Sequence, residues 1–157
     1  MSDDNTGNLN LKKDLYLLRI KTILVGIQKI NFEEFLKNHL NLDIELSPHD
    51  VFQHVIIESL MAVEYAIKKN DAEILRHANT LIENLESEQG DEENIPLARI
   101  FAKLLTKAKN VCEAGLSVSG MIVTFEWEYF KRSFNEKIPQ KIAASDKHDS
   151  TIRYSNN

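Results

Sequence analysis

The chain has 157 residues, 43% of them hydrophobic and 27% charged, as expected for a single globular domain with a sizeable core. Its net charge of −5 is uneven, because residues before Lys131 carry about −8 and those from Lys131 onward about +3. The acidic body disfavours nucleic acid as the main partner. No apolar run is long enough for a membrane span or a signal segment. The single Cys112 excludes an internal disulfide framework. We therefore expect a cytoplasmic protein.

Only five glycines and three prolines interrupt the chain, which favours long helices. Residues 1–10 are polar and are expected to be disordered. The spacing of apolar residues predicts a first helix from about Leu11 to Ile30, with a main face and a weaker second stripe. The main face is Tyr16, Ile20, Ile23, Leu24, Ile27 and Ile30, and the second stripe is Leu11, Leu15, Leu18 and Val25. A short helix should follow near Phe32 to His39, with Asn31 and Glu34 placed as a capping box.

The segment from Ser47 to Lys69 carries the clearest helix signals. Ser47 suits the N-cap, Pro48 the first helical position, and Asp50 the electropositive first turn. Its apolar face is Val51, Phe52, Val55, Ile56, Leu60, Val63 and Ile67. On the opposite side, Ile57, Met61 and Tyr65 follow one another at a spacing of four residues. Such a second stripe indicates either a central helix or a binding surface.

Two further helices are predicted by apolar residues at helical spacing. Asp71 begins one of them so soon after Lys69 that the two neighbouring helices should be antiparallel. The other runs from Pro96 to Cys112. Between them, residues 86–93 hold five carboxylates and read as a solvated connector without the ligand pattern of a calcium loop.

The stretch from Val63 to Gly115, with its helix, acidic Gly-Asp loop and helix, resembles flagellar export chaperones of the small helical kind. The resemblance covers about a third of the chain and contains no diagnostic motif. It would imply a helical protein that binds another protein. It does not assign the chain to that family.

The segment from Met121 to Phe134 fits either a strand or a helix, because apolar residues alternate along it and also form two helical faces. A strand would need a partner, and no second strand is evident, so we predict a helix. Pro139 ends it, and residues 139–157 read as a polar tail. The predicted fold is all-α, an up-and-down helical bundle over residues 11–138 with five main helices and one short helix.

The sequence offers two candidates for a chemical site, a histidine–glutamate pair and a single cysteine. His54 and Glu58 lie one turn apart, a spacing found in metal-binding helical bundles, but the sequence offers no second motif to complete such a site. A surface hydrogen-bonded pair is the preferred interpretation, and a metal-binding enzyme or sensor centred on these residues is the alternative. No cofactor is expected. Cys112, at an apolar helical position, reads as a buried structural thiol.

The remaining candidates are surplus apolar residues of the kind that form protein interfaces. They are Ile57, Met61 and Tyr65 on the Ser47 helix and Trp127, Phe130 and Phe134 on the last helix. The alternative for the last helix is that both of its faces are covered in the core. No motif for nucleophilic catalysis, nucleotide binding or DNA binding is present. We therefore expect a non-catalytic protein that binds another protein or a second copy of itself, as an inhibitor or immunity protein, a secretion chaperone or an adaptor.

Overall fold

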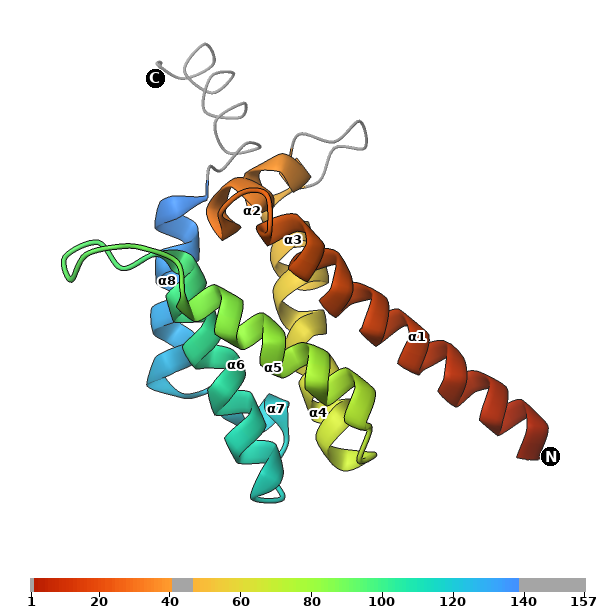
Figure 1. Ribbon diagram of the computed structural model, residues 1–157. Helices are drawn as coiled ribbons and strands as arrows, with labels where there is room; N and C mark the ends of the chain where they lie inside the picture. The colour runs from red at the N-terminus through yellow and green to blue at the C-terminus, as the bar shows by residue number, and fades with distance from the viewer. Residues whose placement is uncertain (1, 41–46, 139–157) are drawn as a thin grey trace, which may run out of the picture.

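The computed structural model describes residues 2–40 and 47–138, with side chains for 11–38 and 47–138, and every regular element in these ranges is helical. The elements are α1 (Ser2–Ile27), α2 (Phe32–Leu40), α3 (Pro48–Val51), the π-helical segment η1 (Phe52–Ile57), α4 (Glu58–Lys68), α5 (Ala72–Glu86), α6 (Leu97–Glu113), α7 (Val118–Met121) and α8 (Phe125–Lys137) (Figure 1). The predicted all-α bundle is confirmed. Its five main helices are α1, the continuous α3–η1–α4 run, α5, α6 and α8, and α2 is the predicted short helix. The four-residue α7 is a second short helix that was not predicted.

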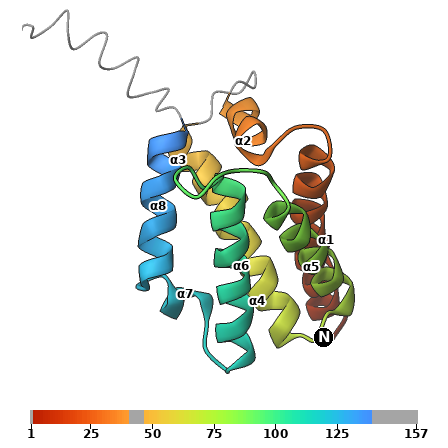
Figure 2. The same cartoon turned by 60° about the vertical axis from the view of Figure 1, so that its left-hand side comes forward.

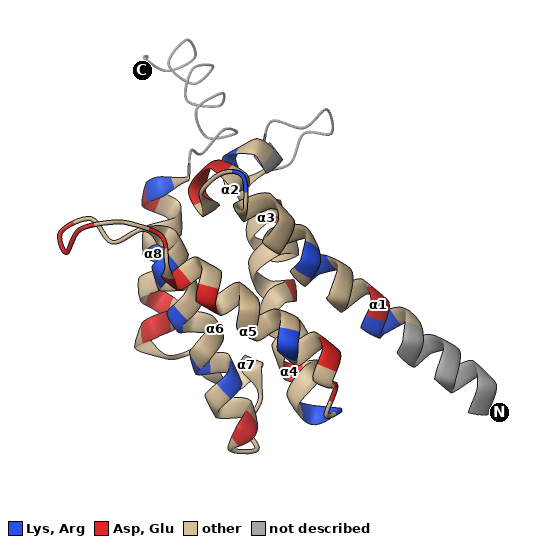
Figure 3. Cartoon of the chain, in the orientation of Figure 1, with Lys and Arg blue, Asp and Glu red and all other residues tan. Residues whose placement is uncertain are grey.

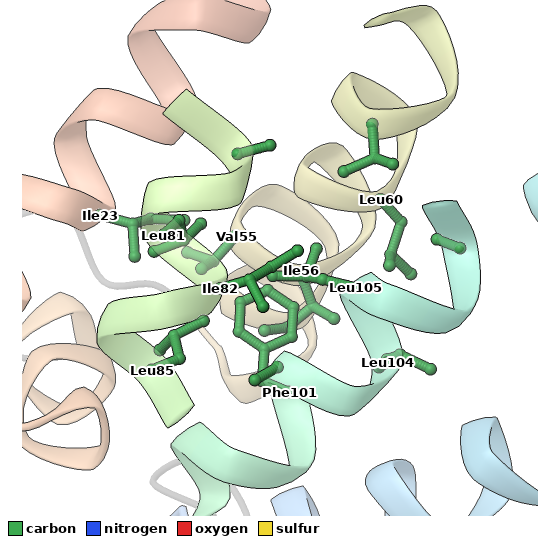
Figure 4. Packing of buried hydrophobic residues seen from close by; sticks show 14 of the residues in the cluster. Ile23, Val55, Ile56, Leu60, Leu81, Ile82, Leu85, Phe101, Leu104 and Leu105 are labelled. Atoms are coloured by element: carbon green, nitrogen blue, oxygen red, sulfur yellow. The ribbon is translucent and has the colours of Figure 1, made fainter. Parts of the chain in front are cut away.

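Helix α6 occupies the middle of the bundle, where it packs against α4, α5 and α8 (Figure 2). Helix α1 packs against α5 and α4 at one edge, and α8 lies at the other. Apolar side chains from these helices meet in one core, in which Phe101 of α6 lies among side chains of η1 and α5 such as Ile56 and Ile82 (Figure 4). No helix in the described parts of the chain is both long and apolar enough to cross a membrane.

The long central run begins as the sequence predicts. The Ser47 hydroxyl accepts a hydrogen bond from the Asp50 N–H at 3.0 Å, and the Asp50 carboxylate accepts one from the Ser47 N–H at 3.1 Å. This reciprocal capping box satisfies backbone donors that the helix itself leaves free. After Lys68 the chain turns at Asn70, whose φ is +53°, and the Asp71 side chain caps α5 by accepting from the Ile74 N–H. The tight join makes α4 and α5 neighbours, as expected.

The connector between α5 and α6 carries acidic residues (Figure 3). Two hydrogen bonds tie its region to α2. The Glu88 carboxylate accepts a hydrogen bond of 2.8 Å from the Phe32 N–H, at the start of α2. In the other direction, the Glu33 carboxylate of α2 accepts from the Leu97 N–H at the start of α6. Burial raises the pKa of the Glu88 carboxyl group. The connector therefore fixes α2 against α6, which corrects the expectation of a purely solvated segment.

The last helical region is confirmed as helix, but its boundaries differ from the prediction. Met121 ends the four-residue α7, and α8 begins only at Phe125. The Thr124 hydroxyl accepts from the Trp127 N–H at 3.4 Å, and two glutamates occupy the first turn of α8. A hydroxyl cap and carboxylates in the first turn are ordinary signals for the start of a helix. Here they start α8 at Phe125, so the apolar run from Met121 to Phe134 does not form one continuous helix.

The expectation for the N-terminal segment differs from the structure, and the one for the C-terminal tail concerns residues that the structure does not describe. The backbone of α1 is helical from Ser2, so the helix includes most of the segment 1–10 for which disorder was expected. The connector 41–46 and the predicted polar tail, 139–157, lie outside the described residues.

Candidate functional site

A groove of about 500 Å³ runs between η1 and α8, and we call it the aromatic groove. Apolar side chains from three elements form its walls, and polar side chains stand at its edge. The residues that line it are Pro48, His49, Phe52, Gln53, Ile57, Ile122, Trp127, Lys131, Phe134 and Asn135. Grooves with apolar walls and a few polar groups are the usual shape of binding sites in proteins.

Ring contacts hold the walls of the aromatic groove in place. The Phe52 ring lies 5.4 Å from the Trp127 ring and 5.1 Å from the Phe134 ring, and both pairs meet edge to face. Phe130 lies behind them, 6.0 Å from Phe52, and is fully buried. Edge-to-face pairs are favoured by the charge distribution of aromatic rings. The groove is therefore lined by side chains that are already fixed before anything binds.

The rim of the aromatic groove carries the polar groups. His49, Gln53 and Asn135 are exposed, and Lys131 is half-buried. The Lys131 ammonium group lies 3.7 Å from the Glu128 carboxylate, a pair that is partly open to solvent. An apolar floor inside a polar rim is the arrangement found at the energetic centres of protein interfaces.

The wall contributed by η1 has an unusual backbone. The N–H of Glu58 bonds to the carbonyl of Gln53, five residues earlier, as in a π-helix. The Ser59 hydroxyl, fully buried, donates to the Val55 carbonyl at 2.6 Å and satisfies an oxygen beside this wide turn. One extra residue in the turn rotates the following side chains relative to a regular α-helix. Such π segments occur often at functional sites.

The six predicted interface residues lie in different places in the structure and differ in burial. Ile57, Trp127 and Phe134 meet at the aromatic groove, although they come from both of the predicted stripes. Phe130 has no exposed surface, and Trp127 and Phe134 are also buried, so the wide exposed aromatic surface predicted on α8 is absent. The reason is tertiary, because Phe52 and the fully buried Phe101 of α6 cover this face.

Met61 and Tyr65 lie elsewhere. Met61, which is 41% exposed, lines a second groove of about 480 Å³ between α1 and α4. Tyr65 is half-buried, with its ring 5.3 Å from that of Tyr16 on α1. The second groove also includes Leu15 and Leu18 of α1.

Sequence reasoning missed the role of Phe52 in the aromatic groove. Its position in the apolar pattern assigned Phe52 only to the core face of the Ser47 helix. In the structure its ring is half-buried and stands between the core and the groove. No sequence signal separates these two roles, because both depend on which residues α8 brings to the same place.

His54 and Glu58 form the one-turn pair expected from their spacing. The His54 Nδ1 atom lies 3.2 Å from one Glu58 oxygen, and the Arg19 Nε atom donates to the other at 3.1 Å. A guanidinium this close repels a metal cation and occupies one of the two carboxylate oxygens. Among the described residues, no group of three histidine, cysteine or acidic side chains is arranged to hold a metal ion.

Cys112 lies at a buried position on α6. Burial, with a smaller contribution from the negative charge of Glu64, raises the pKa of its thiol. A raised pKa keeps the thiol protonated at neutral pH, and the thiolate is the nucleophilic form. Cys112 is therefore suited to a structural role.

Comparison with protein-family models, with curated proteins and with solved structures finds no match.

Proposed function

We propose that this protein acts without catalysis, in the cytoplasm, by binding another protein through the aromatic groove. The observation that carries the proposal is the convergence of Ile57, Trp127 and Phe134, from separate parts of the sequence, on one groove with fixed aromatic walls. Tryptophan and other large apolar groups in such pockets supply much of the free energy of protein association. Inhibitors, secretion chaperones and adaptors all work through contacts of this kind.

The chemistry of the aromatic groove describes the segment that it would take. Walls of Phe52, Ile57 and Trp127 suit one or two large apolar side chains presented by a helix or a loop. Lys131 at the rim suits a carboxylate next to those side chains, because its present partner Glu128 is solvent-exposed and is held only weakly. A partner segment with an apolar anchor beside an acidic residue therefore fits best.

The alternative function, a metal-binding enzyme or sensor at His54 and Glu58, gains no support from the geometry. Glu58 already binds Arg19, and the described part of the chain supplies no third ligand nearby. A surface ion-pair network that joins Arg19 of α1 and His54 of η1 to Glu58 at the start of α4 accounts for these residues.

A matched pair of variants tests the proposal. Ile57→Asp places a carboxylate in the wall of the aromatic groove, whereas Ile67→Asp makes the same change at a half-buried site ten residues further along the same run, away from the groove. Each variant would be used as bait in extracts of the source cells, with captured proteins quantified by mass spectrometry. We expect a protein enriched by wild type and by Ile67→Asp to be lost at least tenfold with Ile57→Asp, because a desolvated charge opposes an apolar anchor.

Thermal melting of both variants provides the control for folding. The comparison is meaningful when the two melting temperatures agree within a few degrees. Equal capture by wild type and by a folded Ile57→Asp variant would remove the aromatic groove from the function.

A further inference from the structure

Helix α1 has a second apolar stripe that the bundle does not cover. Leu11, Leu15 and Leu18 are each close to 60% exposed, and Val25 is 55% exposed. The main face of α1, with Ile20 buried at its centre, lies about half a helical turn away and packs on α4 and α5. Monomeric proteins seldom leave such a line of large apolar side chains in water.

The spacing of the stripe is that of a coiled-coil seam. From Leu11 the steps are four, three, four and three residues, which leads through Leu15, Leu18 and Thr22 to Val25. In heptad notation Leu11, Leu18 and Val25 occupy d positions, and Leu15 and Thr22 occupy a positions. Such alternation keeps one narrow face directed at a single partner helix. The bundle covers the opposite side of α1. Only one further helix can therefore pack on the exposed stripe.

We propose that two copies of this chain pair through α1 as a parallel, in-register, two-stranded coiled coil. The residues of the seam would then each meet their own counterparts across a twofold axis. The two bundles would lie on opposite sides of the pair, because each core-facing side of α1 points away from the seam. This association is separate from partner binding at the aromatic groove, which lies beside α8.

Charges beside the seam favour the parallel arrangement. In this heptad frame Asp14 occupies a g position and Arg19 an e position. In a parallel pair each g residue faces the e residue five positions later in the other copy. Asp14 of each copy therefore faces Arg19 of the other. The Arg19 Nε atom is bound to Glu58, and the other donors of its guanidinium can reach outward. An antiparallel pair that matched Leu15 with Leu18 would also place opposite charges together, because Asp14 would face Lys21. The same pair would bring Lys12 and Arg19 together, a like-charge contact that the parallel pair avoids.

The size of the seam predicts a dimer of moderate strength. From Leu11 to Val25 the contact is about 22 Å long, at 1.5 Å per residue. Such a contact lies near the lower limit of about 1,000 Å² of total buried surface for specific interfaces. Buried area alone does not set an affinity, but a contact this small should give a dimer whose population depends on protein concentration.

The full chain in solution tests this proposal by its mass and by disulfide trapping. Sedimentation velocity from low to high micromolar concentration should show wild type shifting from 18.0 kDa to twice that mass. Leu18→Glu, at an exposed position, should raise the dissociation constant about 100-fold without changing helical content, because two carboxylates would meet at one layer of the seam. Thr22→Cys should form an intermolecular disulfide under mild oxidation, because the two copies of this a position meet only in the parallel pair.

Thr80→Cys provides the matched control, because Thr80 is exposed on α5 and away from the seam. It should cross-link no faster than wild type. Wild type that stays monomeric throughout the concentration range would overturn the proposal. A dimer in which Thr22→Cys cross-links no faster than Thr80→Cys, or one that Leu18→Glu leaves unchanged, would overturn the parallel seam.

Discussion

Phe130→Ala should lower the free energy of unfolding by about 4 kcal/mol, as expected for removing a fully buried phenylalanine. The Phe130 side chain has no exposed surface, and its ring lies 5.7 Å from Phe101 and 6.2 Å from Phe134. Alanine would leave a cavity at the point where α6, η1 and α8 meet. For a domain of this length the melting temperature should fall by roughly 10–15 °C, measured by circular dichroism at one fixed protein concentration.

Phe125→Ala is the matched control on the same helix. Phe125 is 74% exposed, and its ring stacks on Tyr129, 6.0 Å away. Its replacement should change the free energy of unfolding by about 0.5 kcal/mol or less. A similar loss for both variants would contradict the burial of one face of α8.

Gly26→Ala should destabilise the protein by about 2 kcal/mol, although alanine is the better helix former. A Cβ atom at position 26 would overlap the ring of Phe35, which is itself buried where α1 meets α2. The ring or the helix would have to move, and the cost of that displacement should exceed the gain in helix propensity. Chemical denaturation measures the difference directly.

Gly120→Ala separates this steric effect from a general effect of glycine substitution. Gly120 lies in α7, and the nearest atom to an added Cβ would be the Ser117 hydroxyl at an ordinary contact distance of 3.9 Å. Alanine should be neutral there or stabilising by up to about 1 kcal/mol. Opposite signs for the two variants are therefore expected. Stabilisation by Gly26→Ala would contradict the close approach of α1 and α2.

Local signals predicted the helices because their causes are local. The capping box of Ser47 and Asp50, the Asp71 cap and the 3.6-residue periodicity of α5 and α6 act within a few residues. The prediction of a helix for the last segment rested instead on the rest of the chain, in which no partner strand is evident.

What the sequence left undetermined depends on contacts between distant segments. Whether Phe130 is buried is decided by Phe52 and Phe101, which lie far from it along the chain. Glu88 caps α2 across 56 residues, a pairing that composition cannot reveal. The π-helical turn of η1 differs from an α-helix by a single hydrogen-bond register, so apolar periodicity predicted the helix without its wide turn. The aromatic groove depends on the contacts of Phe52 with α8 and on the backbone of η1, and it could not be drawn from the sequence.

Site-specific photo-cross-linking in the source cells tests binding at the aromatic groove most directly. A photoreactive amino acid at Asn135, exposed on the groove rim, should yield a covalent adduct with a protein other than this chain, identified by mass spectrometry. The same group at Thr80, on the exposed side of α5, should not yield that adduct. The absence of any adduct at Asn135, or the same adduct at both positions, would contradict the proposal that this groove holds a partner.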